Sequence, residues 1–198
     1  MVIAMPPLSA ILFTVLVLLV ATQRVWELAR SRRNESLMRA MGGREHARGQ
    51  MPWMTALHTL WLIAMPLEVV LMRRTFDLQT ALIALVAFAF GQGLRLAAMS
   101  ALGDRWCVRV ITVPRASSVD DGVFRFVRHP NYLGVVLEIA ALPMVHGAWV
   151  TAIVFSFANA VLLAFRIRAE ERALRLDNAY ERDLGDRPRM IPRLWGGA

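Results

Sequence analysis

A cluster of hydrogen-bonding side chains stands where a polar segment gives way to a long apolar run. Arg128, His129, Asn131 and Tyr132 form this cluster, and Pro130 interrupts it. Proline suits the first position of a helix, and the free backbone N–H groups of a first turn can bind a carboxylate or another anion. Polar groups beside lipid are costly unless they have partners, so this junction is the first candidate for chemistry.

A second charged group follows the last apolar segment of the chain. Arg166 and Glu170 are four residues apart, so they share a helix face and can form an ion pair. Glu171 points to another side and needs its own partner. A cationic or hydroxyl-rich ligand between this group and the junction would satisfy the carboxylates. We therefore predict that both groups border one binding site.

Three further ionisable side chains, His58, Glu68 and Glu138, lie inside apolar segments. Ionised carboxylates are unstable against lipid, so we expect both glutamates to face the interior of a helix bundle, either paired or protonated. The histidine is either a structural hydrogen-bonding residue or a base. Cys107 is the only cysteine, which excludes an intramolecular disulfide and a cysteine-based metal cluster, and no metal site is predicted.

The elements that position these residues are long uncharged blocks. The chain has 198 residues, of which 57% are hydrophobic, and its mean hydropathy of +0.45 indicates an all-α integral membrane protein. Five transmembrane helices are expected, at about residues 8–26, 53–72, 78–99, 131–145 and 148–165, in a single membrane domain of residues 1–198. The first is expected to be retained rather than cleaved as a signal peptide. An amphipathic surface helix is expected at residues 28–41 and a short strand at residues 108–113.

Arginine placement predicts the orientation of these helices. The net charge is +8 and the chain has no lysine; 21 of its 23 arginines fall in residues 24–50, 95–128 and 166–198. Five spans place these segments on one side, so the positive-inside rule predicts an external N-terminus and a cytosolic tail, in a bacterial inner (plasma) membrane. Topology explains the basic composition better than nucleic-acid binding does. The short link at residues 146–148 predicts an antiparallel hairpin that returns the second charged group to the junction.

One pattern combines the junction with the second charged group. It reads Arg128-His129-Pro130-x-Tyr132-x-Gly134, then an apolar hairpin, then Arg166 and Glu170-Glu171. Over about residues 120–195 this combination resembles the isoprenylcysteine carboxyl methyltransferase family of integral membrane methyltransferases. In the first half, Gln23-Arg24-Val-Trp-Glu27 and Arg33-Asn34-Glu35 also resemble a bacterial branch found with type III polyketide synthases. Members of that branch look like O-methyltransferases of long-chain phenols or pyrones.

The resemblance implies S-adenosyl-L-methionine bound without a Rossmann domain, in a pocket made by the last hairpin and the tail. By motif position, the cofactor-binding residues would be Arg128, His129, Pro130, Tyr132, Gly134 and Glu171, and the catalytic residues near the acceptor would be Arg166 and Glu170. The sequence departs from the family pattern after the two glutamates, where Phe-Gly and paired tyrosines are common. Here Tyr180 keeps only part of that pattern.

The expected activity is S-adenosylmethionine-dependent O-methylation of a lipophilic acceptor that enters from the bilayer. The acceptor oxygen belongs either to the carboxylate of a prenylated-cysteine-like substrate, which needs no base, or to a phenol or enol hydroxyl of a long-chain polyketide lipid, which benefits from one. Membrane lipids are the other expected partners. One alternative is an NADPH-dependent reductase like the membrane sterol reductases, which share the Arg-His-Pro-Asn-Tyr-Leu-Gly run but usually carry Asp-Glu and a cysteine after the last span. Another is a non-enzymatic membrane protein.

Overall fold

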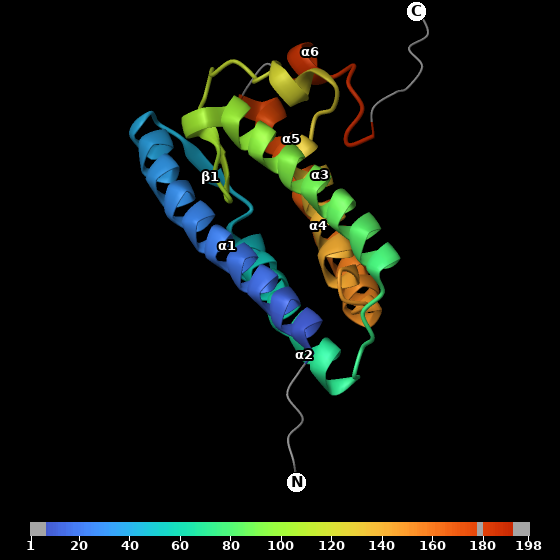
Figure 1. Ribbon diagram of the computed structural model, residues 1–198. Helices are drawn as coiled ribbons and strands as arrows, with labels where there is room; N and C mark the ends of the chain where they lie inside the picture. Colours follow the sequence, from blue (N-terminus) through green and yellow to red (C-terminus); the bar gives the residue numbers. More distant parts are fainter. Residues whose placement is uncertain (1–6, 178–179, 192–198) are drawn as a thin grey trace, which may run out of the picture.

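Helices dominate the protein (Figure 1). The computed structural model describes residues 7–177 and 180–191. Its long helices are α1 (Leu8–Ala40), α2 (Met51–Leu71), α3 (Leu78–Leu102), α4 (Pro130–Met144) and α5 (Trp149–Asp177). Shorter elements connect and cover them: β1 (Arg44–His46), η1 (Arg48–Gln50), η2 (Gly103–Arg105), β2 (Val110–Thr112), η3 (Gly122–Arg125) and α6 (Tyr180–Leu184). This architecture confirms the predicted all-α integral membrane fold.

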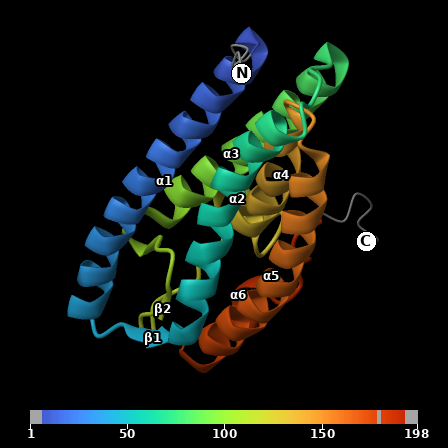
Figure 2. The same ribbon diagram turned by 90° about the horizontal axis from the view of Figure 1, so that it is seen from below.

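Four of the helices, α1, α2, α3 and α5, are long and apolar enough to cross a membrane. α4 stands at the place of the remaining predicted span and has 15 residues. At 1.5 Å per residue it extends about 22 Å, less than the roughly 30 Å of a bilayer's hydrocarbon core. α4 and α5 lie side by side and are joined by a short turn, as the hairpin prediction requires (Figure 2). The helix that carries the junction is therefore the short member of the bundle.

The first helix is longer than predicted. The expected surface helix at residues 28–41 is not a separate element, because α1 continues through it without a break. No proline or glycine interrupts this stretch, and a buried stripe of Glu27, Ser31, Asn34 and Met38 runs along its last turns. Asn34 donates a hydrogen bond to the carbonyl oxygen of Trp106 at 2.7 Å. This end of α1 therefore packs against the loop after α3 rather than lying on the membrane surface.

Four charged side chains meet in the interior of the bundle: Arg24 and Glu27 of α1, Arg95 of α3 and Glu138 of α4. Nη2 of Arg95 lies 2.6 Å from Glu27, and its Nη1 lies 3.0 Å from Glu138. Arg24 pairs with both carboxylates as well. The prediction that Glu138 faces inward and is paired is confirmed. Because an unpaired buried charge is strongly destabilising, this cluster fixes the three helices relative to one another.

The second predicted intramembrane carboxylate, Glu68, caps α5. It accepts hydrogen bonds from the backbone N–H groups of Val150 at 3.1 Å and Thr151 at 2.6 Å. Arg74 pairs with it at 2.8 Å. The unsatisfied N–H groups of a first helical turn favour a carboxylate at this position. The prediction of a paired Glu68 that faces the bundle interior is confirmed.

α3 and α4 approach each other closely at two glycines. A Cβ atom added at Gly134 would lie 2.5 Å from Cγ of Arg95 and 2.6 Å from the carbonyl oxygen of Gly91. A Cβ atom at Gly91 would lie 3.0 Å from the carbonyl oxygen of Gly134. Small residues allow such close contact between membrane helices. Gly134 therefore has a packing role, and the cofactor contact suggested for it stays a prediction.

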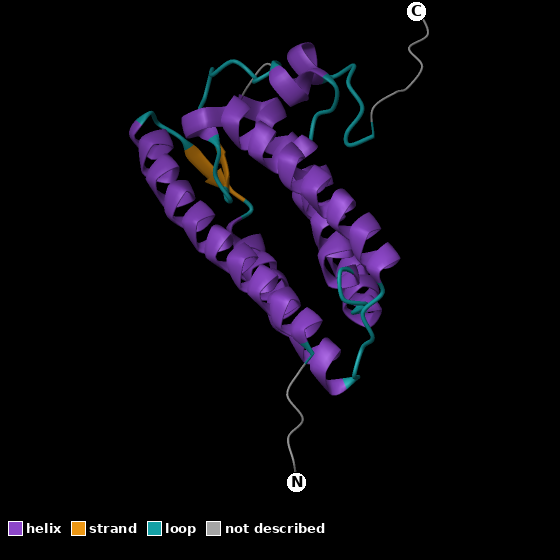
Figure 3. Cartoon of the chain, in the orientation of Figure 1, coloured by secondary structure: helices purple, strands orange, loops and turns teal. Residues whose placement is uncertain are grey.

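A two-stranded sheet lies at the end of the bundle near α6, opposite the first turn of α1 (Figure 3). β1 and β2 pair antiparallel, with Glu45 opposite Ile111, and β2 falls within the predicted strand at residues 108–113. α5 runs past its predicted end at residue 165 to Asp177, which accepts a hydrogen bond from Thr112 and lies 3.3 Å from Nε2 of His46. The sheet is thus tied to α5. We call β1, β2 and α6 together the cap.

Candidate functional site

The hairpin brings the junction beside the charged group of α5, as predicted. Nε2 of His129 lies 3.2 Å from Oε1 of Glu171. The hydroxyl of Tyr132 donates a hydrogen bond to Glu170 and accepts one from Nε of Arg166 at 3.1 Å. Sequence spacing suggested a direct ion pair between Arg166 and Glu170; the Tyr132 hydroxyl bridges them instead. Three side chains from two helices therefore form one hydrogen-bonded chain.

The start of α4 and the loop before β2 orient this chain. The rings of His129 and Tyr132 stack with their centroids 5.4 Å apart, and Pro130 between them is buried at the first position of α4. Arg166 is only 5% exposed and also donates to the carbonyl oxygen of Val108. Because its nitrogens are held from two sides, protein groups alone fix the position of the guanidinium.

Glu171 ties the C-terminal tail to the junction. It is 2% exposed, and Arg189 binds it through two nitrogens at 3.0 and 2.7 Å. Arg128 adds a second guanidinium, 3.6 Å from Oε1. The backbone N–H groups of Arg128 and His129 donate to the carbonyl oxygens of Pro188 and Arg189 at 2.9 and 2.8 Å. The hydrogen bonds to Glu171 raise the pKa of Arg189 above its ordinary value, so it stays charged.

Arg189 was not among the predicted site residues. The only sequence signal for it was Glu171, for which an unidentified partner was expected; nothing in the local sequence says that a tail residue supplies it. Within the predicted cofactor-binding stretch at residues 120–195, residues 178–179 and 192–195 lie outside the described part of the chain.

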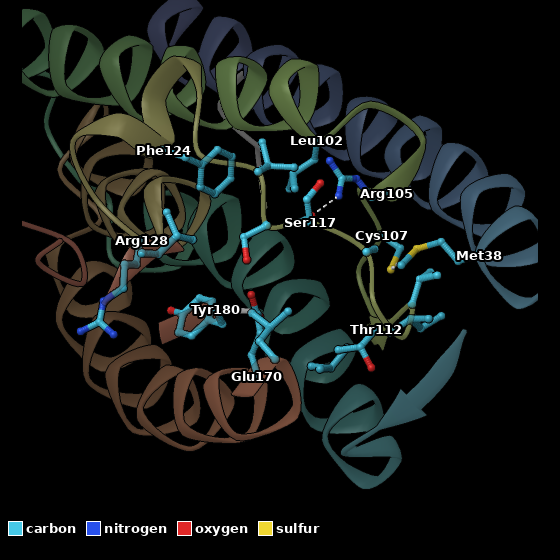
Figure 4. A pocket seen from close by; sticks show the side chains of 18 of the residues that line it. Met38, Leu102, Arg105, Cys107, Thr112, Ser117, Phe124, Arg128, Glu170 and Tyr180 are labelled. Atoms are coloured by element: carbon cyan, nitrogen blue, oxygen red, sulfur yellow. Dashed lines mark hydrogen bonds between the residues drawn. The ribbon is translucent and has the colours of Figure 1, made fainter. Parts of the chain in front are cut away.

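A cavity of about 160 Å³ lies under the cap, and we call it the cap-side cavity (Figure 4). Arg128, His129, Glu170 and Tyr180 line it, whereas Glu171 does not. Buried lining atoms without a hydrogen-bond partner in the described part of the chain are Nε of Arg128, Oγ of Ser118 and Oη of Tyr180. Burial raises the pKa of Tyr180, so its hydroxyl stays protonated and can donate. Unsatisfied buried polar atoms are costly, and this lining therefore suits a polar ligand.

A larger cavity of about 430 Å³, the bundle cavity, lies between α1, α2, α4 and α5. Most of its lining is apolar, and Tyr132 and Arg166 belong to its polar part. Cys107 lines both this cavity and the cap-side cavity. Because Glu170 lines the cap-side cavity only, the hydrogen-bonded chain Glu170–Tyr132–Arg166 runs from one cavity to the other.

A third hollow, of about 780 Å³, lies against α1 and α2 and adjoins the bundle cavity. The residues shared by the two are Leu28, Met51, Thr55, Thr59 and Val108. Arginine side chains of the third hollow, Arg32, Arg48 and Arg109, lie toward its cap end. The bundle cavity and this hollow between the first two helices are thus neighbours that share part of their lining.

Fold and site together define a membrane protein in which a polar pocket adjoins an apolar intramembrane cavity. The chain belongs to the isoprenylcysteine carboxyl methyltransferase (ICMT) family, which matches residues 82–176. That range takes in most of α3, all of α4 and nearly all of α5, with both the junction and the two glutamates. Members of this family are membrane methyltransferases that use S-adenosyl-L-methionine as methyl donor.

Two bacterial relatives extend the similarity beyond that range. The chain is 35% identical to the uncharacterized protein YpbQ of Bacillus subtilis (strain 168) over 163 residues. The aligned region covers 82% of this chain and 96% of YpbQ. It is 26% identical over 152 residues to an uncharacterized protein of Haemophilus influenzae, which covers 76% of this chain and 88% of that protein. No solved structure matches the chain. Neither relative's name states a substrate.

Proposed function

We propose that this protein is an S-adenosylmethionine-dependent O-methyltransferase of a lipophilic acceptor. The observation that carries the proposal is the hydrogen-bonded chain Glu170–Tyr132–Arg166, which connects a polar cavity under the cap with a mostly apolar cavity among the helices. Transfer between a polar donor and a lipophilic acceptor needs two such compartments that meet at one point.

The lining of the cap-side cavity fits the polar groups of the donor. Glu170 offers a carboxylate for an ammonium or a ribose hydroxyl, and Arg128 offers an unpartnered nitrogen for a carboxylate. The buried hydroxyls of Ser118 and Tyr180 add further hydrogen-bonding groups, and the ring of Phe124 can pack against a purine. The donor would supply an electrophilic methyl group on a sulfonium sulfur.

Arg166 and Tyr132 would position the acceptor oxygen. Displacement at a methyl carbon requires the attacking oxygen in line with the breaking bond, and such positioning can supply roughly 7–11 kcal/mol of the barrier reduction. Arg166 is already held by Tyr132 and by the carbonyl oxygen of Val108, so little reorganisation is needed when the acceptor arrives. Its positive charge on the bundle cavity would attract an oxygen that carries negative charge.

The acceptor would reach this point from the bilayer. The hollow between α1 and α2 offers a route for an apolar chain into the bundle cavity. We place the cap, with the arginine-rich segments around it, in the cytosol of a bacterial cell, with the N-terminus outside the inner membrane. The methyl acceptor would then be either a carboxylate or a phenol or enol hydroxyl on a long lipid.

Thermal unfolding of the detergent-purified protein tests the proposal. S-adenosylhomocysteine should raise the midpoint, because a ligand at 100 times its Kd stabilises the folded state by about 2.7 kcal/mol. NADPH should leave the midpoint unchanged. Arg166→Ala should keep the stabilisation by S-adenosylhomocysteine but lose methyl transfer. Stabilisation by NADPH and not by S-adenosylhomocysteine would support a reductase instead.

Mass spectrometry of lipids from cells with and without the gene would identify the acceptor. The product should exceed its precursor by the mass of one methylene, and the precursor should accumulate when the gene is absent. A lipid profile that is the same in both strains would count against a methyl acceptor among the membrane lipids.

A further inference from the structure

His58 lines the bundle cavity and belongs to none of the contacts described above. Its Nδ1 lies 2.8 Å from the carbonyl oxygen of Met54, one turn earlier on α2. A carbonyl oxygen only accepts, so Nδ1 carries the proton, and in the neutral ring Nε2 keeps its lone pair. Among the described residues nothing donates a hydrogen bond to this Nε2. The cavity therefore contains an imidazole whose basic nitrogen is free.

This imidazole lies on α2 between two side chains that reach the α4–α5 hairpin. Met54, one turn before it, packs against the apolar cluster of Tyr132, Leu163 and Ile167. Trp61, three residues after it, donates from Nε1 to the carbonyl oxygen of Ile139 at 3.2 Å. His58 and Tyr132 line the same cavity. Thr55 and Thr59, on either side of His58 in the sequence, also line the hollow proposed as the route of the acceptor.

The other candidate proton acceptor of the bundle cavity is occupied. Glu27 accepts from Gln23 at 3.0 Å through Oε1, and from Arg24 at 2.7 Å and Arg95 at 2.6 Å through Oε2. Cys107 donates to a backbone carbonyl oxygen, and burial raises its pKa to about 12, so it is a neutral thiol. The arginines of the lining are cations. Of the described lining residues, His58 is the one with a free basic atom.

We propose that His58 is the general base of the methyl transfer and that the acceptor is a hydroxyl compound, a phenol or an enol, rather than a carboxylate. The inference rests on the proposed function. A carboxylate arrives ionised and has no proton to lose, whereas a hydroxyl oxygen becomes a strong nucleophile only as its proton leaves. A free imidazole nitrogen in this cavity can therefore assist methylation of a hydroxyl acceptor, by removing its proton, but not methylation of a carboxylate.

The methyl transfer breaks two bonds and forms two. The O–H bond of the acceptor breaks, and its proton moves to Nε2 of His58. The oxygen electron pair forms the new bond to the methyl carbon, and the electrons of the carbon–sulfur bond return to sulfur. The products are a methyl ether, neutral S-adenosylhomocysteine and an imidazolium. One positive charge has moved from sulfur to His58, which then releases its proton to water.

The charges that face His58 come from the surrounding helices. Arg24 and Glu27 lie on α1, Arg95 on α3 and Arg166 on α5, and all four line the same cavity. Arg24, Glu27 and Arg95 belong to the neutral cluster that Glu138 completes, and Arg166 is linked to Glu170 through the Tyr132 hydroxyl. These charges therefore balance, and none of the described carboxylates is bonded to the ring. Burial without a paired anion favours the neutral imidazole, which is the form that a base requires.

Activity with two acceptor probes tests the inference on the full-length protein in detergent. We expect wild type to methylate 5-pentadecylresorcinol, a phenol, with a rate that rises as an imidazole deprotonates. His58→Asn keeps a donor for the Met54 carbonyl oxygen but has no base, so kcat should fall about 100-fold or more and this limb of the pH profile should vanish. Free imidazole should restore part of the activity of His58→Ala. His146→Gln, a buried histidine bonded to Ser9 far from the cavity, is the matched control and should resemble wild type.

A second measurement does not depend on turnover. The visible absorbance of 4-nitro-3-pentadecylphenol reports its ionisation, and we expect wild type bound to S-adenosylhomocysteine to produce the phenolate band at a pH where His58→Asn does not. Equal kcat, pH profile and phenolate signal in wild type and His58→Asn would overturn the inference, as would methylation of N-acetyl-S-farnesylcysteine, a carboxylate, without any methylation of the phenol. Calorimetry of S-adenosylhomocysteine binding distinguishes a failure of the proposed function from a failure of the His58 inference. No binding of S-adenosylhomocysteine by wild type would overturn the proposed function itself. Normal binding, together with His58 variants that behave like wild type, would overturn only the role of His58.

Discussion

Tyr132 lies between the two cavities, and its hydroxyl both donates and accepts a hydrogen bond. It donates to Glu170 on the cap side and accepts from Arg166 on the bundle side. Arg166 and Glu170 sit on one face of α5, four residues apart, so a residue of another helix is needed to separate them. Glu171, the next residue along, points to the tail instead. The two adjacent glutamates therefore have different roles. Glu170 lines the cap-side cavity, and Glu171 binds the C-terminal tail to the junction.

Glu171→Gln should weaken donor binding because it releases the C-terminal tail from the junction. The substitution removes the charge that holds Arg189, Arg128 and His129. Breaking a fully buried pair costs about 3–5 kcal/mol. The loss here should be smaller, about 1–3 kcal/mol, because Arg189 is half exposed. We expect roughly tenfold weaker S-adenosylhomocysteine binding by calorimetry.

The same variant should expose the tail to trypsin sooner than wild type does, since the Arg189–Met190 bond is a cleavage site in the docked segment. Asp186→Asn changes an exposed carboxylate of the same tail and serves as the control, with unchanged affinity and cleavage. Wild-type affinity and cleavage in Glu171→Gln would show that tail docking does not depend on this carboxylate.

Cys107 should be nearly inert to alkylation although it lines both cavities. Burial, together with the nearby negative charge of Glu35, raises the pKa of its thiol to about 12. The reactive thiolate is then about one part in 10,000 at pH 8, compared with about a quarter for an exposed cysteine of pKa near 8.5. We expect N-ethylmaleimide to react roughly 1,000-fold more slowly than with Ser36→Cys in a Cys107→Ala background, measured by intact mass. The rate for Cys107 should keep rising by about tenfold per pH unit above pH 8, whereas the rate for the exposed thiol should level off above its pKa of about 8.5. Equal rates at pH 8 would show that the thiol is not buried.

At the scale of elements, the short helix α4 carries most of the site and is positioned by its contact with α3. Gly134→Ala should destabilise the protein by about 1–3 kcal/mol, since the added Cβ would lie 2.5 Å from Arg95 and 2.6 Å from the Gly91 carbonyl oxygen. Gly93→Ala is the matched control: no atom lies within 4 Å of its added Cβ, so helix propensity alone predicts a gain of about 0.5–1 kcal/mol. Unfolding in mixed detergent and SDS micelles measures both. Lower affinity for S-adenosylhomocysteine in Gly134→Ala with unchanged stability would instead support the cofactor contact predicted from the motif.

Local pattern predicted the elements well, and long-range pairing only in part. Apolar runs located all five long helices, and Pro130 marked the start of α4, because both signals are local. The short link of the hairpin also predicted correctly that the junction lies beside Glu170 and Glu171. The partners of Glu138 came from α1 and α3, and that of Glu171 came from the tail, which no local pattern specifies. The extension of α1 was missed because its polar stripe looks like a surface helix until the loop after α3 covers it.

At the scale of the whole molecule, polar groups are distributed unevenly between the two ends. The cap and the arginine-rich segments lie at one end, and the turn after α2 and the α4–α5 turn lie at the other, near the first turn of α1 (Figure 1). Between them, Arg24, Glu27, Arg95 and Glu138 hold three helices together in a neutral cluster. The proposed donor site therefore lies at the arginine-rich end, which the proposed orientation places in the cytosol, where a water-soluble donor is available.

Cysteine labelling on cells tests this orientation directly. In a Cys107→Ala background, Thr75→Cys places an exposed thiol in the turn between α2 and α3, and Ser36→Cys places one at the cap end of α1. The arginine distribution predicts that a membrane-impermeant maleimide, applied to spheroplasts, labels Thr75→Cys at once and Ser36→Cys only after permeabilisation, because the positive-inside rule puts the arginine-rich end in the cytosol. The reverse order of labelling would place the donor cavity outside the cell, where S-adenosylmethionine is not supplied, and would contradict both the orientation and the proposed methyl transfer.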